Sequence, residues 1–312
     1  MKKFIFVFLA LFMGCEIAMA NSQYVGSQKQ KEAEPIIRVQ LRQCGLRSSP
    51  IKIAALATNP PFSWTETEMQ ENNVLYTGKG FLIDFMQQIL NELNISTQIV
   101  GYPTDDKMLA DFQIGKVDMV VGMYYDPKIQ LGGHAFLNPS IMQNLVSVIF
   151  MKGKEKKVEK FEDLVGLKGV VRQDEKFYDY IRLKHTKMLE IQEAIDSKEA
   201  FTKLLTGEVD YMLSSPYAAE AEARRFKLNL NIAMSQMPLM GQEFFVLYSG
   251  NSLCPQYRQE IAAKIKEKRQ DMNAMKRDLI SYINNWGQRF KNDPSLVSQL
   301  QKEQSQLQQE QK

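Results

Sequence analysis

A turn that occurs twice sets the strongest limit on the fold of this chain. Its sequence is Gly-x-Val-Asp followed by a short apolar run, and the two copies span residues 115–123 and 207–213. Each copy follows a segment with helical character, so the glycine stands where a helix ends, a place that favours the left-handed conformation. The apolar run is typical of a buried parallel strand. The two units predict an α/β protein with two candidate ligand loops, because open α/β sheets bind ligands beyond the carboxyl ends of their strands.

The first twenty residues have the features of a signal peptide. Lys2 and Lys3 form a positive start, residues 4–13 are apolar but too short to span a bilayer, and Ala18-Met19-Ala20 is a small-x-small cleavage signal. A weak version of a lipoprotein box ends at Cys15, so lipid anchoring there remains an alternative to soluble export. Both readings take the chain out of the cytoplasm, and we expect a periplasmic protein.

The composition and residue spacing argue against several other classes of protein. The chain has 312 residues, of which 44% are hydrophobic and 24% charged, enough length for two ordinary α/β domains. No basic patch interleaved with aromatic residues argues for nucleic acid. The two histidines lack metal-ligand spacing, so we expect neither a metal nor a cofactor. Export permits a disulfide between Cys44 and Cys254, and two unpaired thiols are the open alternative.

Strands and helices alternate along the chain after a polar N-terminal extension at 21–50, as in parallel sheets. The first series predicts strands at 51–56, 95–102, 118–123 and 144–151, with helices at 81–93 and 107–114. After a basic stretch, the second predicts strands at 169–172, 189–191, 210–213, 228–234 and 243–248, with helices at 174–183, 197–205 and 217–225. Residues 256–286 are predicted as two helices, and the Gln-rich tail at 288–312 as frayed helix or disorder.

Seven motifs occur in a recognisable order. They are Asn59-Pro60-Pro61-Phe62-Ser63-Trp64, Gly80-Phe81-Leu82-Ile83-Asp84, the two turns, Phe136-Leu137-Asn138-Pro139, residues 161–169 and Trp286. Together they resemble the bacterial extracellular solute-binding proteins of family 3, the periplasmic receptors for polar amino acids in ABC importers. The resemblance covers residues 51–287 and implies a two-lobed clamshell, with a mostly parallel, helix-flanked sheet in each lobe and two hinge crossovers. Lobe 1 would comprise 51–150 and 243–287, and lobe 2 would comprise 153–238.

Three positions depart from the pattern by which this family holds an amino acid. Ile129 stands where the family has an Arg for the α-carboxylate, and Ser215 stands where it has an Asp for the α-ammonium. Gln173-Asp174-Glu175 replaces a Gly-Thr or Gly-Ser pair that donates to the same carboxylate. A buried carboxylate needs a charged or multi-donor partner, and two acidic residues would repel it. We therefore do not expect a free α-amino acid bound in the usual way.

The remaining cleft candidates are aromatic, acidic and hydroxyl side chains. They suit a cationic or sugar-like solute, and they are Phe62, Trp64, Tyr124, Tyr125, Asp126, Asp174, Glu175, Ser214 and Ser215. Structural roles remain open for several of them. The rings of Phe62 and Trp64 also fit as covers of the lobe, Asp126 as a turn residue and Asp174 as a helix N-cap. Tyr124 and Tyr125 alternate in direction, so at most one faces a ligand.

These observations favour a non-enzymatic periplasmic binding protein. It would be a monomer that binds a small polar solute and delivers it to an ABC permease or a membrane sensor. One alternative is an enzyme, because Asp174-Glu175-Lys176-Phe177 is similar to the Asn-Glu-Lys-Phe segment of cyclohexadienyl dehydratases, with Glu175 as general acid. The preceding Gly-Gly-Thr and the carboxylate-binding Arg of those enzymes are missing. Another alternative is a degenerate lobe pair that serves as a sensor or protein-interaction module.

Overall fold

The computed structural model describes residues 50–70, 73–130, 134–185, 187–249 and 257–310. Contacts divide the chain into two compact units, and all described residues except Tyr257 belong to the unit formed by Pro50–Leu253 and Arg258–Lys312. The predicted signal peptide, residues 21–49 of the extension, Cys44 and Cys254 lie outside the described residues.

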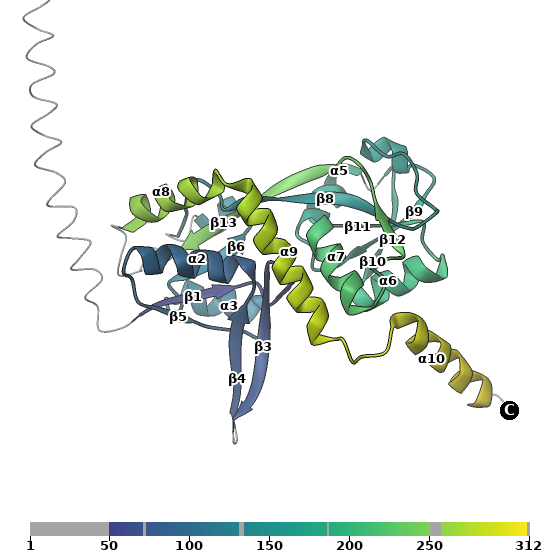
Figure 1. Ribbon diagram of the computed structural model, residues 1–312. Coiled ribbons are helices and arrows are strands. Elements are labelled where there is room, and N and C mark those ends of the chain that lie inside the picture. Colours follow the sequence, from purple (N-terminus) through teal and green to yellow (C-terminus); the bar gives the residue numbers. More distant parts are fainter. Residues whose placement is uncertain (1–49, 71–72, 131–133, 186, 250–256, 311–312) are drawn as a thin grey trace, which may run out of the picture. The chain divides into compact units, whose positions relative to one another are not determined.

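Lobe 1 is built by the first part of this unit (Figure 1). Its elements are β1 (Ile51–Ala55), β2 (Thr58–Asn59), β3 (Ser63–Gln70), β4 (Asn73–Lys79), α2 (Phe81–Glu92), β5 (Thr97–Ile99), α3 (Asp105–Gln113), β6 (Met119–Met123), α4 (Pro127–Gln130) and β7 (Ala135–Phe136). Lobe 2 contains η1 (Phe161–Leu164), β9 (Lys168–Arg172), α5 (Phe177–His185), β10 (Glu190–Ala194), α6 (Ser197–Thr206), β11 (Tyr211–Ser214), α7 (Pro216–Arg225) and β12 (Ile232–Met234). The other elements are β8 (Met142–Met151), β13 (Met240–Tyr248), α8 (Arg258–Arg269), α9 (Met272–Arg289) and α10 (Leu296–Glu310).

Two parallel groups of strands are joined by two crossing strands. The strand order is β10-β9-β11-β8-β13-β6-β1-β5. β1 is parallel to β5 and β6, and β9 is parallel to β10 and β11. β8 and β13 are antiparallel to each other, with Met142 to Val146 opposite Met240 to Phe244, and they continue into lobe 2 and lobe 1 respectively. The predicted α/β architecture with two crossovers is confirmed.

The two copies of the turn have the same structure. The glycine of each copy has a positive φ, 75° in the first and 77° in the second. Asp118 accepts a hydrogen bond on Oδ2 from the backbone N–H of Lys52 (2.9 Å) and donates its own N–H to the Lys52 carbonyl (3.0 Å). Asp210 makes the same pair of bonds with Lys168, at 2.8 and 2.7 Å. Each aspartate therefore fixes the start of its strand against the start of the neighbouring parallel strand.

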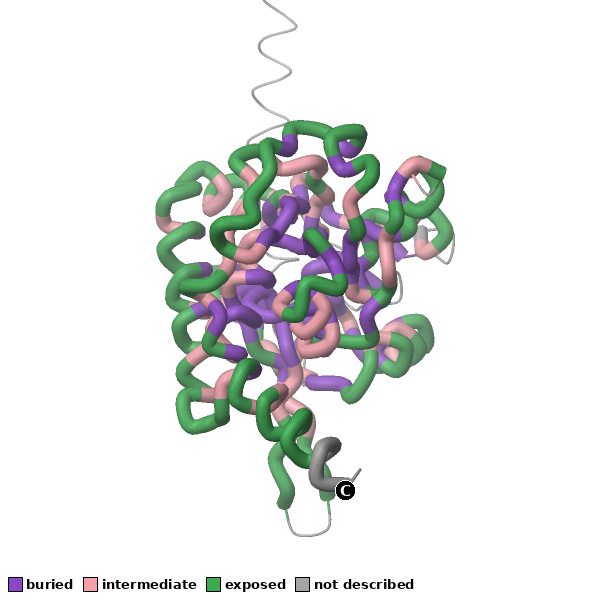
Figure 2. Tube along the Cα trace, turned by 90° about the vertical axis from the view of Figure 1, so that its right-hand side faces the viewer, coloured by how far each residue is buried: buried purple, intermediate pink, exposed green. Residues whose placement is uncertain are grey.

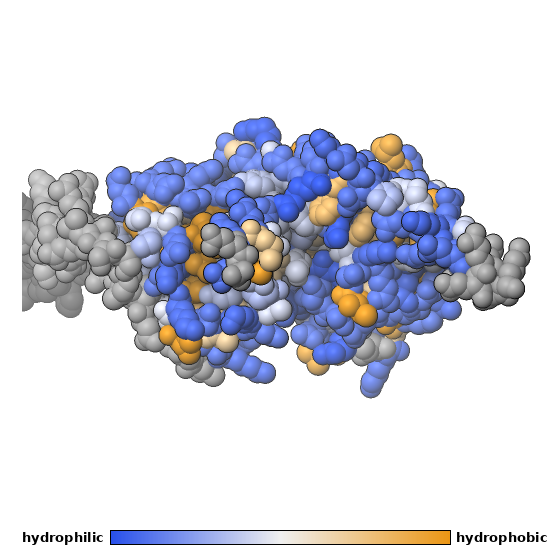
Figure 3. Space-filling view, turned by 90° about the horizontal axis from the view of Figure 1, so that it is seen from below, coloured by the Kyte–Doolittle hydropathy of each residue, from blue (hydrophilic) through white to orange (hydrophobic). Residues whose placement is uncertain are grey.

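The β3–β4 hairpin leaves the body of lobe 1 (Figure 1). The two strands pair from Trp64 opposite Lys79 to Gln70 opposite Asn73. The sequence pattern predicts no element for residues 65–77, because Thr and Glu alternate there without the hydrophobic contrast that marks a half-buried strand. The surface seen in Figure 3 is mostly hydrophilic with separate apolar patches, and the hairpin exposes the apolar side chains of Met69, Val74 and Leu75.

Buried residues concentrate in the strands, and the helices expose their outer turns (Figure 2). α9 packs against α7 of lobe 2, where the Trp286 indole N–H donates to Glu222 Oε1 (2.8 Å). The same helix reaches α2 of lobe 1 through a hydrogen bond from the Tyr282 hydroxyl to Asp84. α10 is a regular helix over much of the predicted tail, and its Leu296 is fully buried in the core of lobe 2. Among the described residues, no helix is both long and apolar enough to cross a bilayer.

Candidate functional site

Arg172, the last residue of β9, is the centre of a polar cluster between the two lobes. Its Nε donates to Asp174 Oδ1 (2.7 Å), and its Nη1 donates to Ser197 Oγ at the start of α6 (3.1 Å). Its Nη2 donates to the backbone carbonyl of Thr58 in lobe 1 (3.3 Å). The Thr58 hydroxyl donates in turn to Asp174 Oδ2 (3.4 Å). Only 13% of the Arg172 side chain is exposed, so these contacts are screened little by water.

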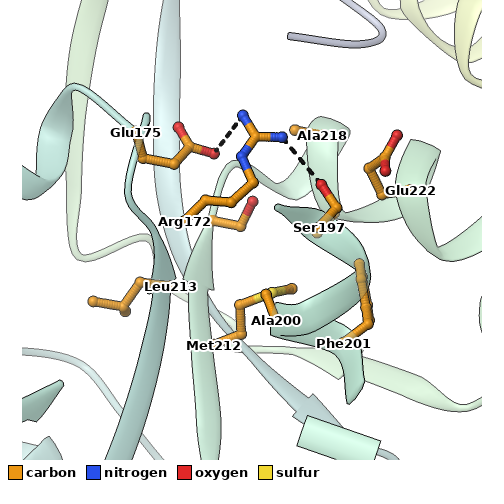
Figure 4. A pocket seen from close by; sticks show the side chains of 11 residues that line it. Arg172, Glu175, Ser197, Ala200, Phe201, Met212, Leu213, Ala218 and Glu222 are labelled. Carbon is orange, nitrogen blue, oxygen red and sulfur yellow. Dashed lines mark hydrogen bonds and ion pairs between the residues drawn. The ribbon is translucent and has the colours of Figure 1, made fainter. Parts of the chain in front are cut away.

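Glu175 lies on the other side of the guanidinium (Figure 4). Its Oε1 is 3.7 Å from Arg172 Nη2, and the side chain is 8% exposed. Burial raises the pKa of the Glu175 carboxyl, and the positive charge of Arg172 opposes part of that rise. The buried carboxyl of Glu175 therefore lies beside a cationic partner within this cluster.

A cavity of about 310 Å³ opens next to the cluster. Lobe 1 contributes Thr58 and Trp64, lobe 2 contributes Arg172, Asp174 and Ser197, and α9 contributes Trp286. Three acidic and three basic side chains line it, namely Asp174, Asp196 and Glu222 with Arg172, Lys198 and Arg225. A second cavity of about 20 Å³, the size of one water, lies behind Arg172 among the residues drawn in Figure 4.

Trp64 lines the cavity as part of an aromatic group. Its ring centroid lies 5.1 Å from that of Trp286 and 6.4 Å from that of Tyr282. Its Nε1 donates to Glu66 Oε1 (3.2 Å), and the guanidinium of Arg289 lies 5.9 Å from the ring centroid. The side chain is 7% exposed, so it combines packing with a position on the cavity wall.

Phe62 and Tyr124 fill the space beside the crossing strands. Phe62 is fully buried, with ring centroids 5.0 Å from Phe244 and 6.2 Å from Tyr217. Tyr124 packs on Phe244 at 4.9 Å, and its hydroxyl accepts a hydrogen bond from Asn144 Nδ2 (2.7 Å). Burial raises the pKa of the Tyr124 phenol, and the negative charge of Glu175 raises it further. Tyr124 is thus electrostatically coupled to the cluster across the lobes.

The four other predicted residues differ in their surroundings, and Ser214 lies beside the Arg172 cluster. Tyr125 is 55% exposed and packs on Phe136, away from the residues that line the cavity. Asp126 accepts from the backbone N–H of Lys128 (2.8 Å), which is the turn role. Ser214 ends β11 and lines the small cavity. Ser215 begins α7, is 1% exposed, and has no hydrogen-bond partner for its Oγ within the described part of the chain.

The structure therefore gathers Trp64, Asp174, Glu175 and Ser214 around a residue that the sequence reading missed, Arg172. A signal was present, because Arg172 is the last residue of the predicted strand 169–172, where ligand groups are expected. Glu222 and Trp286 gave no such signal, because both lie inside helices whose distance from the cleft the sequence does not show. Within the described ranges, no group of three or more His, Cys, Asp or Glu side chains could hold a metal ion.

No family model matches the sequence, and no curated protein matches it either. Solved structures are similar in fold. The GluR0 ligand-binding core in complex with L-glutamate is 14% identical, with a TM-score of 0.57 over 77% of this chain and 98% of that one. An amino acid ABC transporter substrate-binding protein, AbpA from Streptococcus pneumoniae bound to L-arginine, is 14% identical, with a TM-score of 0.56 over 79% and 98%. The ancestral amino-acid-binding protein AncCDT-1, a precursor of cyclohexadienyl dehydratase, is 18% identical, with a TM-score of 0.53 over 79% and 97%.

These matches span nearly the full length of each known structure. The chain therefore has the two-lobed fold of the periplasmic amino-acid-binding proteins. The ligands named for these structures are their own.

Proposed function

We propose that this chain is an exported, monomeric solute-binding protein that holds a small polar solute between its two lobes without chemical turnover. It would pass the solute to an ABC permease or report it to a membrane sensor. The observation that carries the proposal is the cavity of about 310 Å³ with walls from both lobes. A solute that contacts both walls favours one arrangement of the lobes, which is how binding becomes a signal.

The wall chemistry supports a neutral or cationic solute. Trp64 and Trp286 offer aromatic surface, Asp174 offers a partly exposed carboxylate, and Ser197 and Thr58 offer hydroxyls. Aromatic rings beside carboxylates suit sugars and organic cations. Ile129, at the position of the family's carboxylate-binding Arg, packs against the apolar core of lobe 1. These features argue against the amino-acid binding mode of the resembled family.

A thermal-shift screen tests the proposal. Unfolding followed by circular dichroism is measured with a panel of sugars, polyamines, quaternary amines and amino acids. A ligand that binds only the native state raises Tm, and about 100 Kd of ligand adds about 2.7 kcal/mol. Trp64→Ala should abolish the shift, whereas Tyr125→Ala should retain it because Tyr125 lies off the cavity wall. A panel without any shift, or a shift unchanged in Trp64→Ala, counts against the proposed site.

One observation favours the dehydratase alternative. Burial raises the pKa of Glu175, and a raised pKa favours the protonated form that a general acid needs. The adjacent Arg172 weakens this reading, because its charge stabilises the deprotonated form. Incubation of the purified protein with prephenate or arogenate tests whether it is a dehydratase. Formation of an aromatic product, lost in Glu175→Gln, would establish the enzyme, and no product would dismiss it.

A further inference from the structure

We propose that Glu175 is a specificity-determining residue. Together with Asp174 it occupies the guanidinium of Arg172 from within the chain, and it thereby excludes solutes that bind through a carboxylate. This inference rests on the proposed solute-binding function and narrows its ligand class to neutral and cationic compounds.

The guanidinium of Arg172 already has hydrogen-bond acceptors within the chain. A guanidinium presents five N–H donors in a planar fork, which suits a carboxylate. Here the fork already faces Asp174, Ser197 and the Thr58 carbonyl, with Glu175 at 3.7 Å from Nη2. The Arg172 guanidinium, which would otherwise be available to bind a ligand carboxylate, is therefore already bound by oxygen atoms from both lobes.

The other cations on the cavity wall are paired with carboxylates as well. Arg225 Nη1 is 3.2 Å from Glu222 Oε2, and Lys198 Nζ is 3.3 Å from Glu303 Oε1 on α10. Each of the three basic side chains that line the cavity thus has a carboxylate partner among the described residues. A solute carboxylate would meet no cation that lacks a counter-charge, and it would meet Asp174 and Asp196 as like charges.

Glu175 is tethered to the same chain segment as Arg172. A group attached to the chain competes with a free ligand at an effective concentration that short connections raise to the millimolar range or higher. Glu175 is three residues from Arg172 and is 8% exposed, so its carboxylate cannot move into bulk water without opening the cluster. A free carboxylate at ordinary concentration therefore loses the competition for Arg172.

Chemical rescue tests this proposal. Glu175→Ala removes one methylene and the carboxylate, which together have the size of acetate. We expect sodium acetate to raise the Tm of Glu175→Ala by about 2–4 °C over sodium chloride at equal ionic strength, and to leave wild type unchanged. Asp179→Ala is the matched control, because Asp179 is exposed and pairs with Arg182 in the same segment. The double variant Arg172→Met, Glu175→Ala should not respond to acetate.

Each result of the acetate experiment either supports or overturns the proposal, and the ligand panel tests the proposed function separately. No acetate response in folded Glu175→Ala overturns the proposal, as does a shift of wild type by acetate or another simple carboxylate. If Glu175→Ala is unfolded in chloride, its far-ultraviolet circular dichroism is measured in acetate, where recovery of the folded signal supports the proposal and its absence overturns it. A panel ligand that stabilises wild type while acetate leaves Glu175→Ala unchanged removes this inference alone. An acetate response with no panel ligand for wild type removes only the proposed function.

Discussion

Asp105 is a carboxylate that the fold places in a poorly solvated position. It opens α3, and its Oδ1 accepts a hydrogen bond from the backbone N–H of Ala57 (2.8 Å). Burial raises the pKa of Asp105, the Ala57 N–H and Lys176 oppose the rise, and the negative charges of Asp174 and Asp106 add to it. The carboxyl holds the segment that follows β1 through its hydrogen bond to Ala57, and its poorly solvated negative charge is unfavourable.

This residue predicts a pH dependence. A folded-state pKa above the unfolded value means that the contribution of Asp105 to stability is fully present below about pH 3.9 and is lost as the pH rises through the folded pKa. Asp105→Asn keeps the acceptor oxygen without the charge, so it should be at least as stable as wild type at pH 7. That advantage should vanish near pH 4. Urea unfolding at both pH values measures it, with exposed Asp293→Asn as control, and a clear loss of stability at pH 7 would contradict the expectation.

Single residues also show which features the sequence could predict and which it could not. The two turn aspartates were predicted as turn residues, and their positions are confirmed. Their bonds to Lys52 and Lys168 were not predictable, because those partners lie 66 and 42 residues away and the register between strands is a tertiary property. Arg172 was missed for a related reason, because its partners come from three separate segments.

The junction between the Phe62 loop and α2 depends on close backbone contact. The first N–H groups of α2, at Phe81 and Leu82, donate to the carbonyls of Pro61 (3.1 Å) and Phe62 (2.9 Å). Gly80 precedes the helix with φ 120°, and a Cβ there would lie 2.5 Å from the Phe62 oxygen. The glycine thus lets the helix N-terminus hold the loop that carries Phe62 and Trp64.

Gly80→Ala should destabilise the protein by about 3 kcal/mol, because backbone on both sides has to move and the φ angle is unfavourable for an L-residue. Gly115→Ala is the matched control. Gly115 also has a positive φ, but nothing lies within 4 Å of its Cβ position, so its cost should stay near 1–2 kcal/mol. Chemical denaturation of both variants measures the difference, and equal losses would show that the loop contact is unimportant.

Elements with strong periodicity were predicted well, and those governed by tertiary contacts were not. α2 was expected at 81–93 and spans Phe81–Glu92, and the two helices expected at 256–286 are α8 and α9. α5 was expected from residue 174 but begins at Phe177, because Asp174 and Glu175 face Arg172 instead of entering the helix. The β3–β4 hairpin gave no hydrophobic signal to read.

At the scale of the whole molecule, the two lobes are connected by helices as well as by the crossing strands β8 and β13. We propose lobe boundaries at 51–150 with 243–287, and at 153–238, yet α9 within the first set contacts both lobes. It bonds Asp84 through Tyr282 and Glu222 through Trp286. The C-terminal region then continues as α10 onto the core of lobe 2. The lobes are therefore expected to share their stability.

This coupling predicts one cooperative thermal transition. Differential scanning calorimetry of residues 21–312 should give a ratio of calorimetric to van't Hoff enthalpy near 1. Trp286→Ala should lower Tm markedly, because it leaves a large cavity and removes the donor to buried Glu222, a loss of about 3–5 kcal/mol. Two resolved transitions in wild type would show instead that each lobe unfolds independently.

The contact between Trp64 and Trp286 has a practical consequence. These are the two tryptophans of the entire sequence, and their rings lie 5.1 Å apart, one on the hairpin side of lobe 1 and one on the helix that also holds lobe 2. All indole emission and indole exciton coupling of this protein therefore originate where a bound solute would act. Under the proposed function, the chain would carry its own optical probe of solute binding, readable in unlabelled protein.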